Sequence, residues 1–220
     1  MRILLTVIIL FAGIFTAYYM TLEVQQRKQL PVIQPRDVNS EMLNPELAHI
    51  GIGHRIGEFE LLNQKGEIVS LEDVKDKVFV AEYFFTTCLT ICPIMTEEMK
   101  RVQQRFKGND DVKILSFTVD PEHDDVEVMN AYAKEHEAVD GQWHFLTGTK
   151  EDLYSLARNS FFVLKPAEAK NLGDAGSDFI HTNNFVLVDR ELRIRGYYDG
   201  TSNEEIDVLM DDIDLLLKEK

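Results

Sequence analysis

Two cysteines four positions apart are the residues of this sequence whose types and spacing could do chemistry. Cys88 and Cys92 are the two cysteines of the chain, and Pro93 directly follows the second one. A thiolate is both a nucleophile and a soft metal ligand. Positions i and i+4 of a helical turn can bring two sulfur atoms within reach of a disulfide bond or of one metal ion. The pair therefore indicates either thiol–disulfide exchange or a soft metal site.

The elements around the pair are expected to activate it. A nearly continuous apolar run at residues 78–85 predicts a buried strand that ends just before Cys88. Pro93 suits the first turn of a helix, which places Cys92 at the N-terminal mouth of that helix. Free backbone N–H groups and the helix dipole stabilise a thiolate there, so we expect a lowered pKa for Cys88 or Cys92. A structural disulfide, or two inert core cysteines, is the alternative interpretation.

Two sulfur atoms underfill most metal sites, so a third ligand is expected. His181 follows a glycine-containing loop and comes shortly before a predicted central strand, whose entry should lie beside the cysteine-bearing helix. Two thiolates and one imidazole suit copper, and the sulfur atoms favour Cu(I). Zinc would need a fourth ligand, for which Asp178 and Asp120 are candidates. The other histidines are expected to be solvated or satisfied in the core: His49, His54, His123, His136 and His144.

The body of the chain alternates strands and helices. We expect strands at residues 67–70, 78–85, 113–119, 143–146, 184–188 and 192–198, and helices at about 93–106, 124–136, 151–158 and 202–217. This order mixes parallel crossovers with a C-terminal antiparallel hairpin. We therefore predict an α/β domain with a thioredoxin-like fold, in which helices flank a central mixed sheet.

The N-terminus predicts a transmembrane anchor. Arg2 is followed by eighteen uncharged, mostly apolar residues, Ile3 to Met20, which is just enough to cross a hydrocarbon core as a helix. Tyr18 and Tyr19 suit the membrane interface. A cleaved signal peptide is the alternative interpretation. We predict three parts: the anchor in residues 1–22, a tether in residues 23–50 and the domain in residues 51–220.

The charge of the chain excludes one class of partner. There are 23 basic and 38 acidic residues, and the net charge is −15. Such an acidic protein repels phosphate backbones, so we expect no nucleic-acid partner. The acidic body and a cysteine pair that suits an oxidising compartment favour a body on the extracytoplasmic (periplasmic) side of the inner membrane.

Five segments resemble the Sco/SenC family of membrane-anchored, thioredoxin-like copper proteins, which help to assemble the binuclear copper site of cytochrome c oxidase. Similar to the family's motifs are residues 85–93 (FTTCLTICP, against C-P-D-I-C-P), 117–124 (FTVDPEHD, against V-D-P-E-R-D), 146–149 (LTGT, against L-T-G-T/S), 178–182 (DFIHT, against V-D-H-S/T) and 198–200 (YDG, against a closing aromatic-rich turn). The resemblance covers about residues 51–220 and includes the anchor. It implies that Cys88, Cys92 and His181 are copper ligands.

The sequence departs from the family pattern at three places. Leu89 and Thr90 replace the Pro-Asp pair between the cysteines, which removes a carboxylate beside the thiols. Ile180 stands where the family has Asp directly before the histidine, and His123 replaces the Arg of the second motif. These changes concern the tuning of the site and leave the ligand set complete.

The resemblance implies a copper metallochaperone that delivers copper to the copper-bearing subunit of cytochrome c oxidase. The alternative is a membrane-anchored thiol–disulfide oxidoreductase in which Cys88 and Cys92 are the redox pair that reduces the cysteines of the oxidase copper site. A copper or redox sensor with no transfer step is a third possibility, and a classical enzyme is not expected. A peroxidase of the peroxiredoxin type is excluded, because Phe85 stands where its motif has Thr or Ser.

Overall fold

The computed structural model describes residues 9–19, 29–39, 52–163 and 183–219, and the chain divides into two compact units, Met1–Leu30 and Pro31–Lys220. In the first unit, residues 9–19 are helical and exposed. Among the described residues, no helix combines the length and the apolar character that a membrane span requires. The remaining residues of the predicted anchor lie outside the described ranges, so the anchor stays a prediction.

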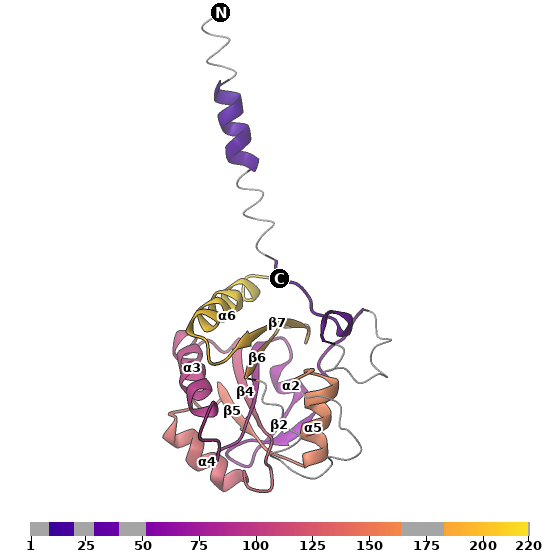
Figure 1. The fold of residues 1–220 in the computed structure, drawn as a ribbon, viewed down its shortest axis with the longest axis vertical. Helices are drawn as coiled ribbons and strands as arrows, with labels where there is room; N and C mark the ends of the chain where they lie inside the picture. Colours follow the sequence, from indigo (N-terminus) through magenta and orange to yellow (C-terminus); the bar gives the residue numbers. More distant parts are fainter. Residues whose placement is uncertain (1–8, 20–28, 40–51, 164–182, 220) are drawn as a thin grey trace, which may run out of the picture. The chain divides into compact units, whose positions relative to one another are not determined.

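A five-stranded mixed sheet forms the centre of the second unit, in the order β5-β4-β3-β6-β7 (Figure 1). β3, β4 and β5 run parallel, whereas β6 is antiparallel to β3, and β7 is antiparallel to β6. The strands are β3 (Val78–Phe84), β4 (Val112–Thr118), β5 (Trp143–Leu146), β6 (Asn184–Val188) and β7 (Ile194–Asp199). The predicted central mixed sheet is confirmed, and each strand lies close to its predicted bounds.

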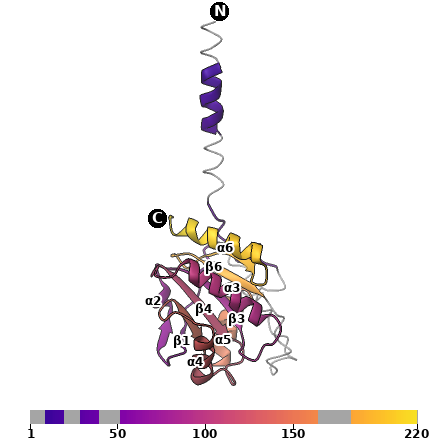
Figure 2. The ribbon, with the colours of Figure 1, turned by 90° about the vertical axis from the view of Figure 1, so that its left-hand side faces the viewer.

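Helices cover both faces of this sheet. α3 (Cys92–Arg105), α4 (Val126–Glu135) and α6 (Asn203–Leu216) lie on one face (Figure 2), and α5 (Lys150–Asn159) lies on the other (Figure 1). The helical spacing of apolar residues in α3 has its expected consequence, since Met95, Met99 and Val102 are fully buried. Ser202 caps α6 by accepting a hydrogen bond from the N–H of Glu205 at 3.3 Å.

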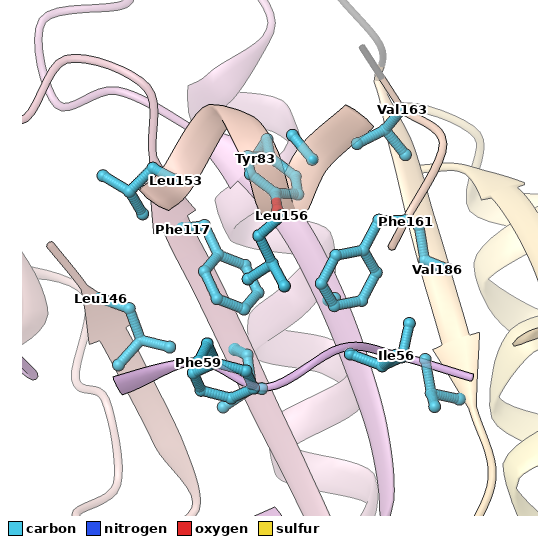
Figure 3. Packing of buried hydrophobic residues seen from close by; sticks show 14 of the residues in the cluster. Ile56, Phe59, Tyr83, Phe117, Leu146, Leu153, Leu156, Phe161, Val163 and Val186 are labelled. Atoms are coloured by element: carbon cyan, nitrogen blue, oxygen red, sulfur yellow. The ribbon is translucent and has the colours of Figure 1, made fainter. Parts of the chain in front are cut away.

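Aromatic side chains fill the core on the α5 side of the sheet (Figure 3). Tyr83 of β3 stacks on Phe117 of β4 with ring centroids 5.1 Å apart, and Phe161 lies 5.5 Å from Phe117. All seven residues of β3 are buried, which explains why its sequence is nearly continuous in apolar residues. The buried strand β3 therefore fixes the starting point of the loop that follows its C-terminal end.

Beside the central sheet lie three short elements, of which the sequence pattern indicated one. β1 (Glu60–Leu62) pairs antiparallel with β2 (Ile68–Ser70) in a separate two-stranded sheet, and α2 (Leu71–Val74) follows β2 directly. Leu62 forms an antiparallel bridge with Thr147, the residue after β5. Of these elements only β2 was predicted, because elements of three or four residues carry too few periodic positions to be recognised.

Part of the predicted tether packs against the second unit. The N–H of Ile33 donates to the carbonyl of Ile194 in β7 at 2.8 Å. Gln34 Oε1 accepts from the N–H groups of Gly53 and His54, at 2.9 and 3.2 Å. The 3-10 helix η1 (Pro35–Asp37) follows. The second unit therefore includes residues upstream of the predicted domain start, while residues 40–51 lie outside the described ranges.

Candidate metal centre

The two cysteines lie at the end of β3 and at the beginning of α3, as the sequence predicted. The chain leaves β3 at Phe84 and turns, and the N–H of Cys88 donates to the carbonyl of Phe85 at 3.2 Å. Cys92 is the first residue of α3, followed by Pro93. Proline is tolerated there because the first turn of a helix leaves its N–H groups unpaired. The turn thus folds both cysteines back onto the same helix mouth.

Both thiols are free, and both side chains are buried, Cys88 to 6% and Cys92 to 4% residual exposure. The loop residue between them contrasts with this, since Leu89 is 90% exposed. Cys88 Sγ lies 3.6 Å from the hydroxyl of Thr90, and it accepts hydrogen bonds from the Cys92 side chain and from its backbone N–H. The two sulfur atoms therefore belong to one site that is shielded from solvent.

The environment separates the two cysteines electrostatically. Burial raises the pKa of the Cys88 thiol, but the hydrogen bonds from Cys92 and Thr90 outweigh burial and lower this pKa to about 7. Burial raises the pKa of Cys92, and the neighbouring Cys88 and the charge of Glu82 raise it further. The expected activated cysteine is therefore Cys88. The helix mouth acts on it through the N–H groups of residues 90 and 92.

Asp124 connects the cysteine loop to the loop that follows β4. Its fully buried carboxylate accepts hydrogen bonds from the N–H of Thr86 at 3.2 Å and from the hydroxyl of Thr86. The hydroxyl of Thr118, the last residue of β4, donates to it at 2.5 Å. These bonds hold the start of the cysteine loop against the neighbouring strand. Asp124 is the last residue of the motif at residues 117–124, but the sequence pattern alone did not predict that it joins the two loops.

A second set of contacts fixes the N-terminal turn of α3. The hydroxyl of Thr96 donates to the carbonyl of Cys92 at 2.8 Å and lies 2.8 Å from the hydroxyl of Tyr132 in α4. The ring of Tyr132 packs against Phe84 at the end of β3, with centroids 5.4 Å apart. The position of Cys92 is thereby tied to both β3 and α4.

The third predicted ligand, His181, lies outside the described residues. The described chain resumes at Asn183, whose carbonyl accepts from the N–H of Gly200 at 2.6 Å. β6 begins at Asn184 and runs antiparallel to β3. Its first residues therefore lie at the edge of the sheet where β3 ends and the cysteine loop begins, which is the geometry on which the His181 prediction rests. Asp178, one candidate for a fourth ligand, also lies outside the described residues.

His54 and His136 are packed against neighbouring groups, in keeping with their predicted structural roles, whereas His144 is only partly satisfied. His54 Nε2 lies 2.8 Å from the carbonyl of Ser160, and His136 packs on Tyr132 with ring centroids 4.3 Å apart. His144 lies on β5, and its buried Nδ1 has no hydrogen-bond partner within the described part of the chain. His123 is exposed beside Asp120 in the loop after β4. His49 lies outside the described residues.

The described residues contain no group of three or more His, Cys, Asp or Glu side chains that could hold a metal ion. Within them, the site consists of two thiols and the groups that position them. Cys88 and Cys92 can together form a disulfide or supply two soft ligands. The ligand set of Cys88, Cys92 and His181 remains a prediction from the sequence.

Sequence and structure comparisons agree on what this chain is similar to. The family model described as SCO1/SenC matches residues 50–218. The SCO1 protein homolog of Bacillus subtilis is 35% identical over 164 residues, which cover 74% of this chain and 82% of that protein. The family-model match includes the cysteine loop and all five strands of the central sheet.

Two solved structures share the fold. BsSco, described as a member of the Sco family of cytochrome c oxidase assembly proteins with a disulfide switch, has a TM-score of 0.64 at 30% identity, over 77% of this chain and 96% of its own. ScoI of Arabidopsis thaliana, solved with copper bound, has a TM-score of 0.57 at 26% identity, over 74% of this chain and 98% of its own. The predicted thioredoxin-like α/β fold is thus confirmed, and the chain belongs to the SCO1/SenC family.

Proposed function

We propose that this chain binds copper through Cys88, Cys92 and His181 and delivers it to the copper-bearing subunit of cytochrome c oxidase. The observation that carries the proposal is a pair of free, buried thiols at the mouth of α3 in a chain of the SCO1/SenC family. Two thiolates and an imidazole form a soft ligand set, which favours Cu(I) over harder cations.

The relatives support copper and the oxidase as parts of this proposal. ScoI of Arabidopsis thaliana has been solved with copper bound, and a relative from Stutzerimonas stutzeri, 27% identical over 144 residues, is named a putative copper-binding protein. BsSco is described as belonging to a family of cytochrome c oxidase assembly proteins. Delivery, as distinct from binding, is our inference from these assignments.

Residues 1–22 would anchor the protein in the inner membrane, with the acidic unit on the extracytoplasmic (periplasmic) side. The apolar run from Ile3 to Met20 supports the anchor. A cytochrome c oxidase subunit that receives copper outside the cytoplasm would then meet the site in the same compartment. A cysteine pair in that compartment must be kept reduced before it can bind copper.

A thiol–disulfide oxidoreductase is the second candidate, and a specific observation favours it. Cys88 has a pKa of about 7, so much of it is thiolate near neutral pH and can attack a disulfide. Cys92 lies beside it and can resolve the mixed disulfide. BsSco is described as having a disulfide switch. In this role the pair would reduce the cysteines of the oxidase copper site.

The copper proposal is tested by titrating Cu(I) against a competing chelator under anaerobic conditions. The compact unit Pro31–Lys220 is used with its thiols reduced. We expect one copper per chain, and we expect His181→Ala to weaken binding strongly because one of three ligands is lost. Cys88→Ser or Cys92→Ser should abolish stable binding. His123→Ala is the matched control, since His123 is an exposed histidine on the neighbouring loop.

Each result separates the candidate functions. Unchanged copper affinity in His181→Ala would contradict the proposal that His181 is the third copper ligand. Near-native copper affinity in either cysteine variant would contradict the proposal that both thiolates bind the metal ion. No tight copper binding by an intact domain, together with a readily reducible Cys88–Cys92 disulfide, would favour the oxidoreductase.

A further inference from the structure

Exposed apolar side chains lie directly beside the two buried thiols. Leu89, the residue after Cys88, is 90% exposed, which is the highest value for a large apolar side chain in the part of the chain that the structure describes. Ile94, two residues after the second cysteine, is 49% exposed. Apolar side chains that gather in water beside a functional site indicate a surface for contact with a partner. We call the four exposed residues next to the cysteines the cysteine rim: Leu89, Thr90, Pro93 and Ile94.

Short-range contacts place Leu89 at the tip of a tight turn. Cys88 Sγ lies 3.6 Å from the hydroxyl of Thr90, so the residues on either side of Leu89 are drawn together. On the other side of the rim, the N–H of Ile94 donates to the carbonyl of Ile91 at 3.0 Å, in the first turn of α3. The turn and the helix therefore hold both apolar side chains in fixed places while leaving them in contact with solvent.

A protein that exchanges metal or disulfide with the thiols has to touch the cysteine rim. Cys88 and Cys92 keep only 6% and 4% of their exposure, and a sulfur atom that reacts with either must approach to about 2 Å. Leu89 is bonded directly to Cys88, and Pro93 is bonded directly to Cys92. The side chains of the rim are therefore within contact distance of any protein surface that delivers such a sulfur atom.

The cysteine rim carries no charge, although the protein is strongly acidic. Residues 83–96 include no Asp, Glu, Lys, Arg or His, whereas the whole chain has a net charge of −15. Glu82, which precedes this stretch, is buried in β3, where the hydroxyl of Ser116 on β4 donates to its carboxylate at 2.6 Å. Its charge is therefore not presented at the surface. The rim offers a partner apolar groups and a hydroxyl group.

Carboxylates lie on the neighbouring loop after β4. Glu122 and Asp125 are exposed there, and Asp124 bonds this loop to Thr86 of the cysteine loop. Such carboxylates attract a basic partner over a distance, and salt screens that attraction. Salt does not screen apolar contact at the rim. Ionic strength can therefore separate the contribution of the rim from that of the loop.

We propose that the cysteine rim is a docking surface with Leu89 as its anchor, and that its occupant is a protein with an apolar pocket beside its own metal-binding cysteines. The inference rests on the proposed function, because it takes the copper-bearing subunit of cytochrome c oxidase as that protein and adds the chemistry of the contact. Leu89 stands at the position of the Pro between the cysteines of the family motif. The anchor is therefore a feature of this chain, and it gives the rim a longer apolar side chain.

The first test is thiol–disulfide exchange by the reduced, metal-free full chain in detergent, with no bilayer present. The probe is the soluble copper-bearing domain of the oxidase subunit, with its two cysteines oxidised to a disulfide. Two electrons and two protons pass from Cys88 and Cys92 to that disulfide, so one disulfide forms as the other is reduced. We expect Leu89→Ser to slow this exchange on the order of tenfold, because the apolar contact is lost. Exchange with cystamine, a small disulfide that needs no docking surface, should be unchanged.

Two further variants and a change of salt serve as controls. Leu89→Met keeps an apolar side chain of similar volume and should react at nearly the unsubstituted rate. Ile68→Ser is the matched control, because Ile68 is 67% exposed on β2, in the separate two-stranded sheet. The slowing in Leu89→Ser should be equal at about 0.05 M and about 0.5 M salt, since apolar contact is not screened.

The second test is transfer of Cu(I) from the loaded full chain to the reduced oxidase domain. Leu89→Ser should bind Cu(I) with unchanged affinity and transfer it on the order of tenfold more slowly. A chain that binds no Cu(I) contradicts the proposed function, and the exchange test then decides the docking surface by itself.

Three results overturn the docking surface. The first is an exchange rate of Leu89→Ser with the oxidase domain that equals the unsubstituted rate, including the case in which the substitution abolishes only self-association or binding to lipid vesicles. The second is an equal slowing with the domain and with cystamine, which would mean that Leu89 acts on the reactivity of the thiols. The third is a slowing that disappears at the higher salt concentration.

Discussion

The pKa of a single residue at this site depends on its hydrogen bonds and its burial more than on its residue type. Cys88 and Cys92 have the same side chain and lie four positions apart, yet the pKa of one is lowered and that of the other is raised. Cys88 receives hydrogen bonds that stabilise its thiolate, and Cys92 is the more desolvated of the two. The sequence predicted that one of the pair would be activated but could not choose between them, because the choice depends on which sulfur accepts the N–H groups of the turn.

Glu82 should leave a signature in the pH dependence of stability. Its pKa rises from 4.5 to about 7 on folding, so the folded state binds its proton more tightly than the unfolded state does. The stabilisation that this proton provides is fully present below pH 4.5 and is lost as the pH rises to about 7. Glu82→Gln lacks this loss, so over the window the unsubstituted chain should lose on the order of 3 kcal/mol relative to it.

Urea unfolding of both proteins at several pH values on each side of the window measures this difference. The matched control is Tyr83→Phe at the next residue of β3, because it removes a buried hydroxyl whose pKa lies well above this range. A difference between Glu82→Gln and the unsubstituted chain that does not change with pH would mean that Glu82 has the same pKa in the folded and unfolded states.

At the scale of elements, the site depends on two loops that are held together from outside the cysteine motif. Asp124 in the loop after β4 accepts from Thr86 at the start of the cysteine loop and from Thr118 at the end of β4. Asp124→Ala would leave these buried donors unpaired. We expect a loss of about 2–4 kcal/mol in the free energy of unfolding, with faster alkylation of Cys88 as its loop is released.

The neighbouring residue supplies the control for this prediction. Asp125 caps α4 by accepting from the N–H of Val128 at 2.9 Å, and it is exposed. Its replacement by Ala should cost only about 1 kcal/mol and should leave the alkylation rate of Cys88 unchanged. Equal effects of the two substitutions, in denaturant unfolding and in alkylation, would contradict the special role of Asp124.

The sequence predicted the elements that carry the cysteines because their signals are local. A continuous apolar run identified β3, and Pro93 identified the start of α3. The clamp at Asp124 and the carboxyl of Glu82 could not be predicted, because each depends on a partner from another strand. A glutamate within an apolar run was the one available signal for Glu82, and without a structure it is indistinguishable from an edge-strand residue that faces solvent.

At the scale of the whole molecule, the second unit begins earlier than the composition of the chain suggested. Prolines and polar residues made residues 23–50 resemble a tether. Ile33 and Gln34 nevertheless bond to β7 and to the chain near His54. Arg195, which is nearly buried, donates to the carbonyl of Pro31 at 3.0 Å. The amino-acid composition does not predict such contacts, because each of these hydrogen bonds uses at least one backbone group.

Two truncations test this boundary. Removing residues 1–30 should yield a folded domain, because the compact unit starts at Pro31. A longer truncation that removes residues 1–38 should have a free energy of unfolding about 1–3 kcal/mol lower than the first. It loses the hydrogen bonds of Ile33 and Gln34 and the burial of Ile33. Denaturant unfolding of both proteins measures the difference. Equal stability would show that residues 31–38 are a tether in the energetic sense.

The same segment bears on how copies of the protein behave toward one another. β5 and β7 are the outer strands of the central sheet, and unpaired backbone groups on an outer strand can recruit a strand from another molecule. Ile33 occupies a carbonyl of β7, and the bridge between Leu62 and Thr147 lies at the end of β5. Both outer strands of the sheet are therefore partly covered, which lowers the risk of edge-to-edge aggregation between copies of the protein.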